Sequence, residues 1–123
     1  MATILFVDDE DAIRRAVGMW LTRKGHTVHQ AADVAAARLI VDAQADALDG
    51  VFIDVRLGEE SGLELFHWLA ARSPALAERV AFMTGDLVGP QGLDGGFTGP
   101  VFAKPFDLTE LDAQAARWGS DRP

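Results

Sequence analysis

The sequence predicts an α/β domain built on a doubly wound, five-stranded parallel sheet. Two observations predict it: short apolar runs alternate with amphipathic stretches along the chain, and most of the runs are apolar at consecutive positions. Strands that are apolar on both faces belong to sheets with helices on both sides, and strand–helix alternation implies right-handed crossovers between parallel strands. The length of 123 residues suits one compact domain.

The first half of the chain contains two strand–helix pairs. Thr3–Val7 is a continuous apolar run, and the stretch after it carries an apolar helical stripe that stops at Gly25. A second strand is expected over Thr27–Ala31. Asp33 is a suitable N-cap for the helix that follows, because its carboxylate can accept from a free backbone N–H of the first turn.

The second half contains three further strands, expected over Gly50–Ile53, Arg79–Met83 and Pro100–Ala103. A loop containing Gly58 joins the third strand to a helix with an apolar stripe. The last helix follows the fifth strand and is capped by Asp107. The expected strand order is 2-1-3-4-5.

One segment breaks the alternation, between the fourth and fifth strands. Residues 85–99 are rich in glycine and include Pro90. Within a helix, glycine costs roughly 1 kcal/mol and proline roughly 3 kcal/mol relative to alanine. We therefore predict a shortened or irregular fourth helix there, of at most one or two turns, in a segment that is mostly loop.

Composition narrows the classes of function. The net charge of −8 disfavours direct binding to nucleic acid, which needs a basic face. No apolar run is long enough to cross a membrane, and no leader sequence opens the chain. The lack of cysteine excludes disulfides and thiolate metal sites. We expect a cytoplasmic protein, with the domain over residues 1–118, a tail over 119–123 and no output domain in this sequence.

Polar residues follow the strands at one end of the predicted sheet. Asp8 and Asp9 follow the first strand, Asp54 the third, Thr84 the fourth and Lys104 the fifth. In this strand order the ends of strands one and three are neighbours, so the three carboxylates would share one crevice. Clustered carboxylates suit Mg²⁺, which prefers oxygen ligands, and the lysine suits a phosphoryl oxygen. One carboxylate could then take up a phosphoryl group.

These residues resemble the receiver domains of two-component response regulators. The resemblance rests on four short motifs in order, and it covers essentially the whole chain: Asp8-Asp9, Asp54, Thr84-Gly85 and Lys104-Pro105. It implies a flavodoxin-like fold and a phosphoprotein that switches its partner interactions. The partner would be a sensor histidine kinase or a histidine phosphotransfer protein. Such a receiver is not an enzyme in the usual sense, since it catalyses only its own phosphorylation and dephosphorylation.

The resemblance assigns roles within the site. Asp54 would be the phosphoacceptor, forming an aspartyl phosphate. Asp9 and Asp54 would ligate Mg²⁺ directly, Asp8 through water, and Arg56 through its backbone carbonyl. Lys104 would contact the phosphoryl group.

The resemblance also implies a switch and a means of tuning. Thr84 and the aromatic Phe102 would move on activation. The peptide bond into Pro105 would be cis, an isomer that X-Pro bonds tolerate. Arg56 and Asp86 occupy positions that tune the lifetime of the phosphoryl group in the family, and an ion pair between them would hinder attacking water.

Two features qualify the resemblance. Gly58 stands where the family often has proline, which predicts a softer loop, and the Gly-rich segment 85–99 replaces the usual signalling helix. The stretches Met83–Asp86 and Phe102–Phe106 look most like receivers of hybrid histidine kinases, which points to phosphorelay signal transduction. The cognate kinase, the downstream target, homodimerisation and the choice between a stand-alone regulator and an excised domain stay open.

Other functions compete with a receiver. A haloacid-dehalogenase-like Mg²⁺-dependent phosphatase also uses a strand-end aspartate, a threonine and a lysine. It needs a second acid two residues after the nucleophile, where this chain has Arg56. A flavin-binding electron carrier would need to hold a phosphate in the loop after the first strand, which is acidic here. Glu10 and Asp11 are expected to be solvated acids at a helix start.

Overall fold

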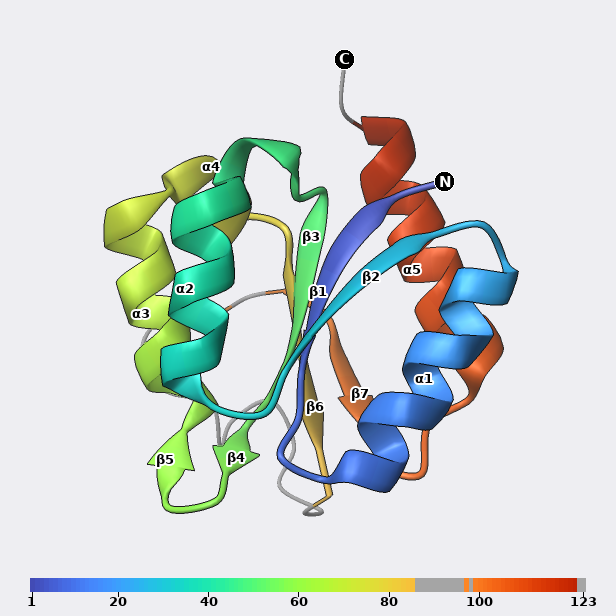
Figure 1. Cartoon of the computed structure of the whole chain (residues 1–123), viewed down its shortest axis with the longest axis horizontal. Helices are drawn as coiled ribbons and strands as arrows, with labels where there is room; N and C mark the ends of the chain where they lie inside the picture. The colour runs from blue at the N-terminus through green and yellow to red at the C-terminus, as the bar shows by residue number, and fades with distance from the viewer. Residues whose placement is uncertain (86–96, 98, 122–123) are drawn as a thin grey trace.

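The structure is a computed structural model, which describes residues 1–85, 97 and 99–121 (Figure 1). Five strands form one sheet in the order β2-β1-β3-β6-β7, and every pair of neighbours is parallel. The predicted order 2-1-3-4-5 is therefore confirmed, with β6 and β7 as the fourth and fifth strands. The bounds are β1 Thr3–Val7, β2 Thr27–Ala31, β3 Gly50–Asp54, β6 Val80–Thr84 and β7 Val101–Ala103.

Helices cover both faces of the sheet, as the doubly wound fold requires. One face carries α1 and α5, and the other carries α2 and α3 (Figure 1). Two short helices, η1 and α4, follow α2 and α3 respectively. The bounds are α1 Asp11–Arg23, α2 Val34–Gln44, η1 Ala45–Ala47, α3 Gly62–Arg72, α4 Pro74–Ala77 and α5 Leu108–Asp121. No helix in the described part of the chain combines the length and the apolar character needed to span a membrane.

The ends of the helices follow the local signals in the sequence. Asp33 accepts a hydrogen bond from the backbone N–H of Ala36 at 2.8 Å and so caps α2. Asp107 accepts from the backbone N–H of Thr109 at 2.9 Å at the start of α5. Gly25 has a φ of 99° directly after α1, a conformation that other residues rarely adopt.

The structure differs from the predictions at several boundaries. Strand β3 ends one residue later than predicted, β6 is shifted by one residue, and β7 begins one residue later. The loop expected after β3 contains a small antiparallel hairpin, β4 Arg56–Leu57 with β5 Glu60–Ser61. Helix α5 continues to Asp121, three residues beyond the buried Trp118. The predicted irregular fourth helix falls on residues 86–96, which lie outside the described residues.

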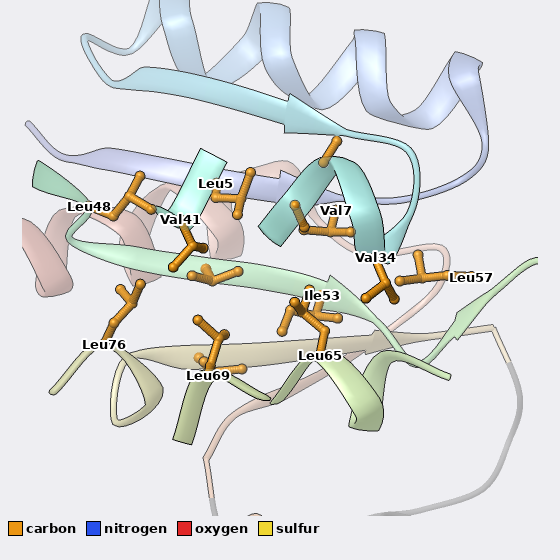
Figure 2. Close-up of a cluster of buried hydrophobic side chains, with 14 of the residues drawn as sticks. Leu5, Val7, Val34, Val41, Leu48, Ile53, Leu57, Leu65, Leu69 and Leu76 are labelled. Carbon is orange, nitrogen blue, oxygen red and sulfur yellow. The ribbon is translucent and has the colours of Figure 1, made fainter. Parts of the chain in front are cut away.

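The core consists of two clusters, one on each face of the sheet. Alternate residues of each strand point to opposite faces, so neighbours in sequence such as Phe52 and Ile53 enter different clusters. The cluster beneath α2 and α3 contains Leu5, Ile53 and Leu65, all fully buried (Figure 2). The sheet is therefore held from both sides, and its carboxyl ends form a rigid edge for polar residues.

Candidate functional site

The site lies at the carboxyl ends of β1, β3, β6 and β7. Val7 is in register with Ile53, which places Asp8 and Asp54 at the ends of adjacent strands. The next strand, β6, ends in Thr84, and Lys104 directly follows the last strand, β7. Asp8 is fully buried and Asp54 is 5% exposed. The polar residues thus sit at the topological position where open parallel sheets bind ligands.

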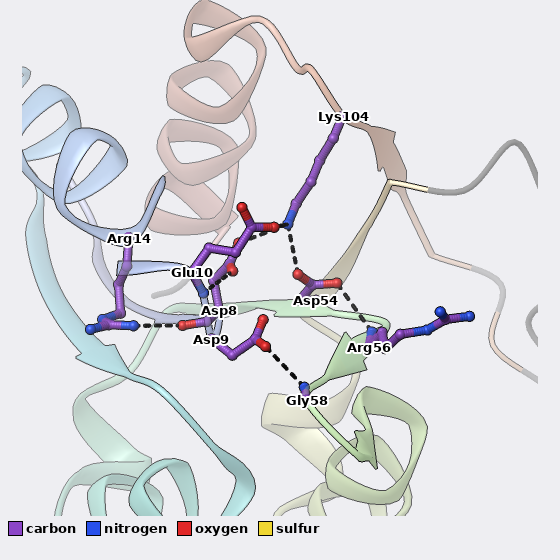
Figure 3. Close-up of polar contacts among 8 residues, drawn as sticks. All are labelled: Asp8, Asp9, Glu10, Arg14, Asp54, Arg56, Gly58 and Lys104. Carbon is purple, nitrogen blue, oxygen red and sulfur yellow. Dashed lines mark hydrogen bonds and ion pairs between the residues drawn. The ribbon is translucent and has the colours of Figure 1, made fainter. Parts of the chain in front are cut away.

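Lys104 is the centre of the polar contacts (Figure 3). Its Nζ donates to Asp54 Oδ2 at 2.6 Å and to Asp8 Oδ2 at 3.0 Å, and it lies 3.6 Å from Glu10 Oε1. One ammonium group therefore contacts three carboxylates. The remaining negative charge favours a further cation in this cluster.

Burial and hydrogen bonding shift the pKa values of Asp54 and Lys104. Burial raises the pKa of Asp54, and it outweighs the hydrogen bonds from Lys104 and the Arg56 backbone, which lower it. Burial alone would lower the pKa of Lys104, but the hydrogen bonds to Asp54 and Asp8 and their negative charges raise it above its usual range. The lysine is therefore protonated at neutral pH, beside a carboxylate that is costly to ionise.

The acidic side chains divide into two groups. Asp8, Glu10 and Asp54 each offer a carboxylate oxygen, and these oxygens lie within 4.8 Å of one another. Asp9 lines the same pocket, but its Oδ2 accepts a hydrogen bond from the backbone N–H of Gly58 at 3.0 Å. The arrangement fits Mg²⁺, because hard oxygen donors converge from two adjacent strand ends.

Glu10 is the site residue that the sequence analysis missed. Its side chain is 60% exposed, as expected for a solvated acid at a helix start. Its carboxylate nevertheless joins the cluster with Asp8 and Asp54. The sequence signal that could have revealed it is its place in the run of four acids. The chain turns after β1, so Glu10 folds back onto Asp8, and its N–H donates to Asp8 Oδ1.

The pocket around these residues is open to solvent and has a volume of about 240 Å³. Thr84 and Gly85 line one side of it, and Arg56 and Gly58 line another. A phosphoryl group arriving from solvent could therefore reach Asp54. Glu10 also lines the pocket, and its side chain is largely exposed.

The remaining predicted residues lie around this pocket. The backbone N–H of Arg56 donates to Asp54 Oδ1 at 3.1 Å, while its side chain is exposed and points away from Asp54 (Figure 3). Phe102 is half-buried, and its ring centroid lies 6.2 Å from that of Phe52. The peptide bond between Lys104 and Pro105 is cis. Asp86, and with it the predicted pair with Arg56, lies outside the described residues.

Comparison with known families shows which family has this fold. Residues 4–116 match the model of the response regulator receiver domain family. The chain is a response regulator receiver domain. The receiver is therefore part of two-component signalling, and the alternatives of a haloacid-dehalogenase-like phosphatase and a flavin carrier gain no support.

Relatives of the receiver include regulators and a sensor kinase. It is 31% identical over 116 residues to the alginate biosynthesis transcriptional regulatory protein AlgB of Pseudomonas aeruginosa, covering 93% of the receiver and 25% of AlgB. It is 31% identical over 112 residues to the sensor kinase CckA of Brucella abortus, covering 89% of the receiver and 12% of CckA. The receiver thus spans a quarter or less of these two proteins.

Solved structures share its fold. The receiver domain from the hybrid histidine kinase CckA has a TM-score of 0.77 and 27% identity, with 94% of this chain and 97% of that chain covered. The response regulator TrrA from Thermotoga maritima, in complex with Mg²⁺ and BeF, has a TM-score of 0.82 and 22% identity, with 96% and 99% covered. The predicted likeness to receivers of hybrid kinases thus has a structural counterpart.

Proposed function

We propose that the receiver accepts one phosphoryl group on Asp54 from a phosphohistidine of a sensor histidine kinase or histidine phosphotransfer protein. The observation that carries this proposal is the contact between Lys104 Nζ and Asp54 Oδ2 at 2.6 Å, in an open pocket at the strand ends. An oxygen of Asp54 bonds to phosphorus and the phosphorus–nitrogen bond breaks. The imidazole nitrogen keeps the electron pair and takes up a proton.

The residues of the pocket divide the work of this transfer. Receiver domains bind Mg²⁺ in an acidic pocket, and here Asp9 and Asp54 are proposed as direct ligands, with Asp8 acting through water and Arg56 through its carbonyl. When bound, the cation would neutralise part of the negative charge on the phosphoryl group during transfer. Lys104 has the mobile ammonium needed to move from the carboxylates onto a phosphoryl oxygen.

A second set of residues is proposed to act after transfer. The hydroxyl of Thr84 would donate to the phosphoryl group, and Phe102 would change its packing with it. Thr84 lines the pocket, and Phe102 lies in the adjoining strand beside the core. Arg56 and Asp86 are proposed to tune the lifetime of the aspartyl phosphate. The receiver would then act only on its own phosphoryl group.

Intact-protein mass spectrometry tests the phosphoacceptor. The receiver is incubated with Mg²⁺ and a phosphorylated histidine phosphotransfer domain, and Asp54→Asn is compared with Asp42→Asn, which removes an exposed carboxylate remote from the pocket. The wild type and Asp42→Asn should each gain one phosphoryl group, and Asp54→Asn none. Uptake by Asp54→Asn, or repeated turnover of a phosphate ester by the wild type, would contradict the proposal.

A further inference from the structure

The hairpin formed by β4 and β5 stands between the acidic pocket and the start of α2. Leu57 pairs with Glu60, so the turn consists of Gly58 and Glu59. Gly58 has a φ of 63° and Glu59 does not have a positive φ, which matches a type II′ hairpin turn. Proline could not adopt this φ and has no N–H. The hairpin therefore depends on the glycine that sets this chain apart from the usual family pattern.

On one side the hairpin holds two carboxylates of the pocket. The N–H of Arg56 donates to Asp54 Oδ1 at 3.1 Å, and the N–H of Gly58 donates to Asp9 Oδ2 at 3.0 Å. Both acceptors are carboxylates, so these are charge-assisted hydrogen bonds when the acids are ionised. Each of these hydrogen bonds holds one oxygen of its carboxylate, and the hairpin does not contact the other oxygen through these bonds. The hairpin thus sets the orientation of both acids.

On its other side the hairpin reaches the first residue of α2. Glu60 Oε1 accepts from the backbone N–H of Val34 at 3.4 Å, a donor with no partner inside its own helix. Leu57 is 3% exposed and anchors the hairpin in the same core cluster as Val34. Of the three hydrogen bonds, the one to Val34 is the longest, so a small shift of the hairpin would break it first.

We propose that Glu60 is a positioning residue for the pocket, and that the hairpin couples cation and phosphoryl binding to the N-terminus of α2. The inference rests on the proposed function. A cation at Asp9 neutralises part of the charge on the carboxylate that Gly58 contacts. A phosphoryl group bonded to Asp54 Oδ2 would turn Oδ1, which Arg56 contacts, into a carbonyl oxygen and place the negative charge on the phosphoryl oxygens. Leu57 holds the hairpin against the core, and β4 is paired with β5, so a change in the bonds on the pocket side is transmitted across the hairpin to the bond between Glu60 and Val34. The coupling is reciprocal, so changes at Glu60 alter cation affinity.

Backbone amide NMR of the full chain tests the coupling. The amides of Val34, Arg56 and Gly58 are followed during titration with MgCl₂ and then with beryllofluoride, a stand-in for the phosphoryl group. Glu60→Ala removes the acceptor, and Glu60→Gln keeps an acceptor oxygen while removing the charge. Glu59→Ala is the matched control, because it removes a neighbouring exposed carboxylate that has no polar partner in the described part of the chain.

In the wild type the three amides should move with one midpoint. Glu60→Ala should abolish the response of Val34 and weaken the Mg²⁺ Kd about threefold, the scale of one weak hydrogen bond. Glu60→Gln and Glu59→Ala should keep both the response and the Kd. A purely structural role would lower stability without separating Val34 from the other two amides.

Two results would overturn the coupling while leaving the proposed cation site in place. One is a Val34 amide that stays still while Arg56 and Gly58 move. The other is a Glu59→Ala variant that weakens Mg²⁺ binding as much as Glu60→Ala, since general electrostatics would then explain both. A titration in which no amide moves would instead overturn the proposed cation site, and the coupling with it.

Discussion

Asp54 combines two conflicting demands on a single carboxylate. Phosphoryl transfer needs it ionised, and burial at 5% exposure makes ionisation costly. The raised pKa of Asp54 shows that burial prevails over the contact with Lys104. A group whose pKa is raised by folding stabilises the fold while protonated, and this contribution is lost as the pH rises through its pKa in the folded state. At neutral pH the ionised Asp54 therefore destabilises the resting protein.

Replacing Asp54 by asparagine should stabilise the protein at neutral pH without Mg²⁺. The amide has nearly the same shape and carries no buried charge, so the free energy of unfolding in urea should rise by about 1 kcal/mol. The gain should shrink as the pH falls through the pKa of Asp54. Asp42→Asn, an exposed carboxylate that pairs with Arg72, should change stability little. A less stable Asp54→Asn would mean that the ion pair with Lys104 outweighs burial.

At the scale of elements, helix α3 begins directly against the strand that carries Asp54. Gly62 is buried, and its N–H donates to the carbonyl of Val55 at 2.7 Å. A Cβ at Gly62 would lie 2.1 Å from the backbone oxygen of Asp54. Glycine is therefore required there by close approach of the two backbones. The position of the proposed phosphoacceptor depends on the first residue of the next helix.

Gly62→Ala should damage both stability and phosphorylation. The new methyl group must push either α3 or β3 aside, which should cost about 2 kcal/mol in unfolding free energy. The phosphorylation rate should also fall, because the shift moves Asp54 relative to Lys104. Urea unfolding measures the loss of stability, and a phosphorylation time course measures the fall in rate.

Gly18→Ala in α1 is the control for that experiment. A Cβ at Gly18 would meet only the end of the Gln30 side chain, which can move away. Its stability should stay near that of the wild type and its phosphorylation rate should not change. Equal behaviour of the two variants would remove the argument from close packing.

At the scale of the whole molecule, the two ends of the sheet differ in the polar contacts that they make. At the end opposite the pocket, His26 joins the start of the chain to α5. Its Nδ1 accepts from the backbone N–H of Ala2 at 3.0 Å, so its Nε2 carries the proton and donates to Asp112 at 2.7 Å. This end is closed by polar contacts between distant segments. The pocket end instead gathers carboxylates, in a protein whose net charge is already −8.

Mg²⁺ should therefore stabilise the whole fold more than NaCl at the same ionic strength. Salt only screens the acidic charge, whereas a cation bound in the native pocket at about a hundred times its Kd adds about 2.7 kcal/mol. Thermal unfolding measures the difference. The Mg²⁺-specific gain should fall in Asp9→Asn, and an equal gain with both salts would argue against a specific site.

The amino-acid sequence by itself determined the number and order of the strands, and it predicted five polar residues at their carboxyl ends. Apolar runs, helical stripes and caps are local signals, and the ends of parallel strands meet at one edge wherever the sheet forms. For this reason the strand ends alone predict that Asp8, Asp54 and Lys104 lie together, and their hydrogen bonds confirm it. The hairpin after β3 and the last turn of α5 were not predicted, because no apolar period continues there.

Only the tertiary structure decided which partners the polar side chains near the pocket contact. It placed Glu10 beside Lys104, turned Asp9 toward Gly58 and joined Glu60 to Val34. Each of these contacts depends on which way a polar side chain turns at the surface, where no packing pattern in the sequence specifies a partner. The physical reason is range: periodicity fixes which face of an element is buried, but not which distant donor its polar atoms find.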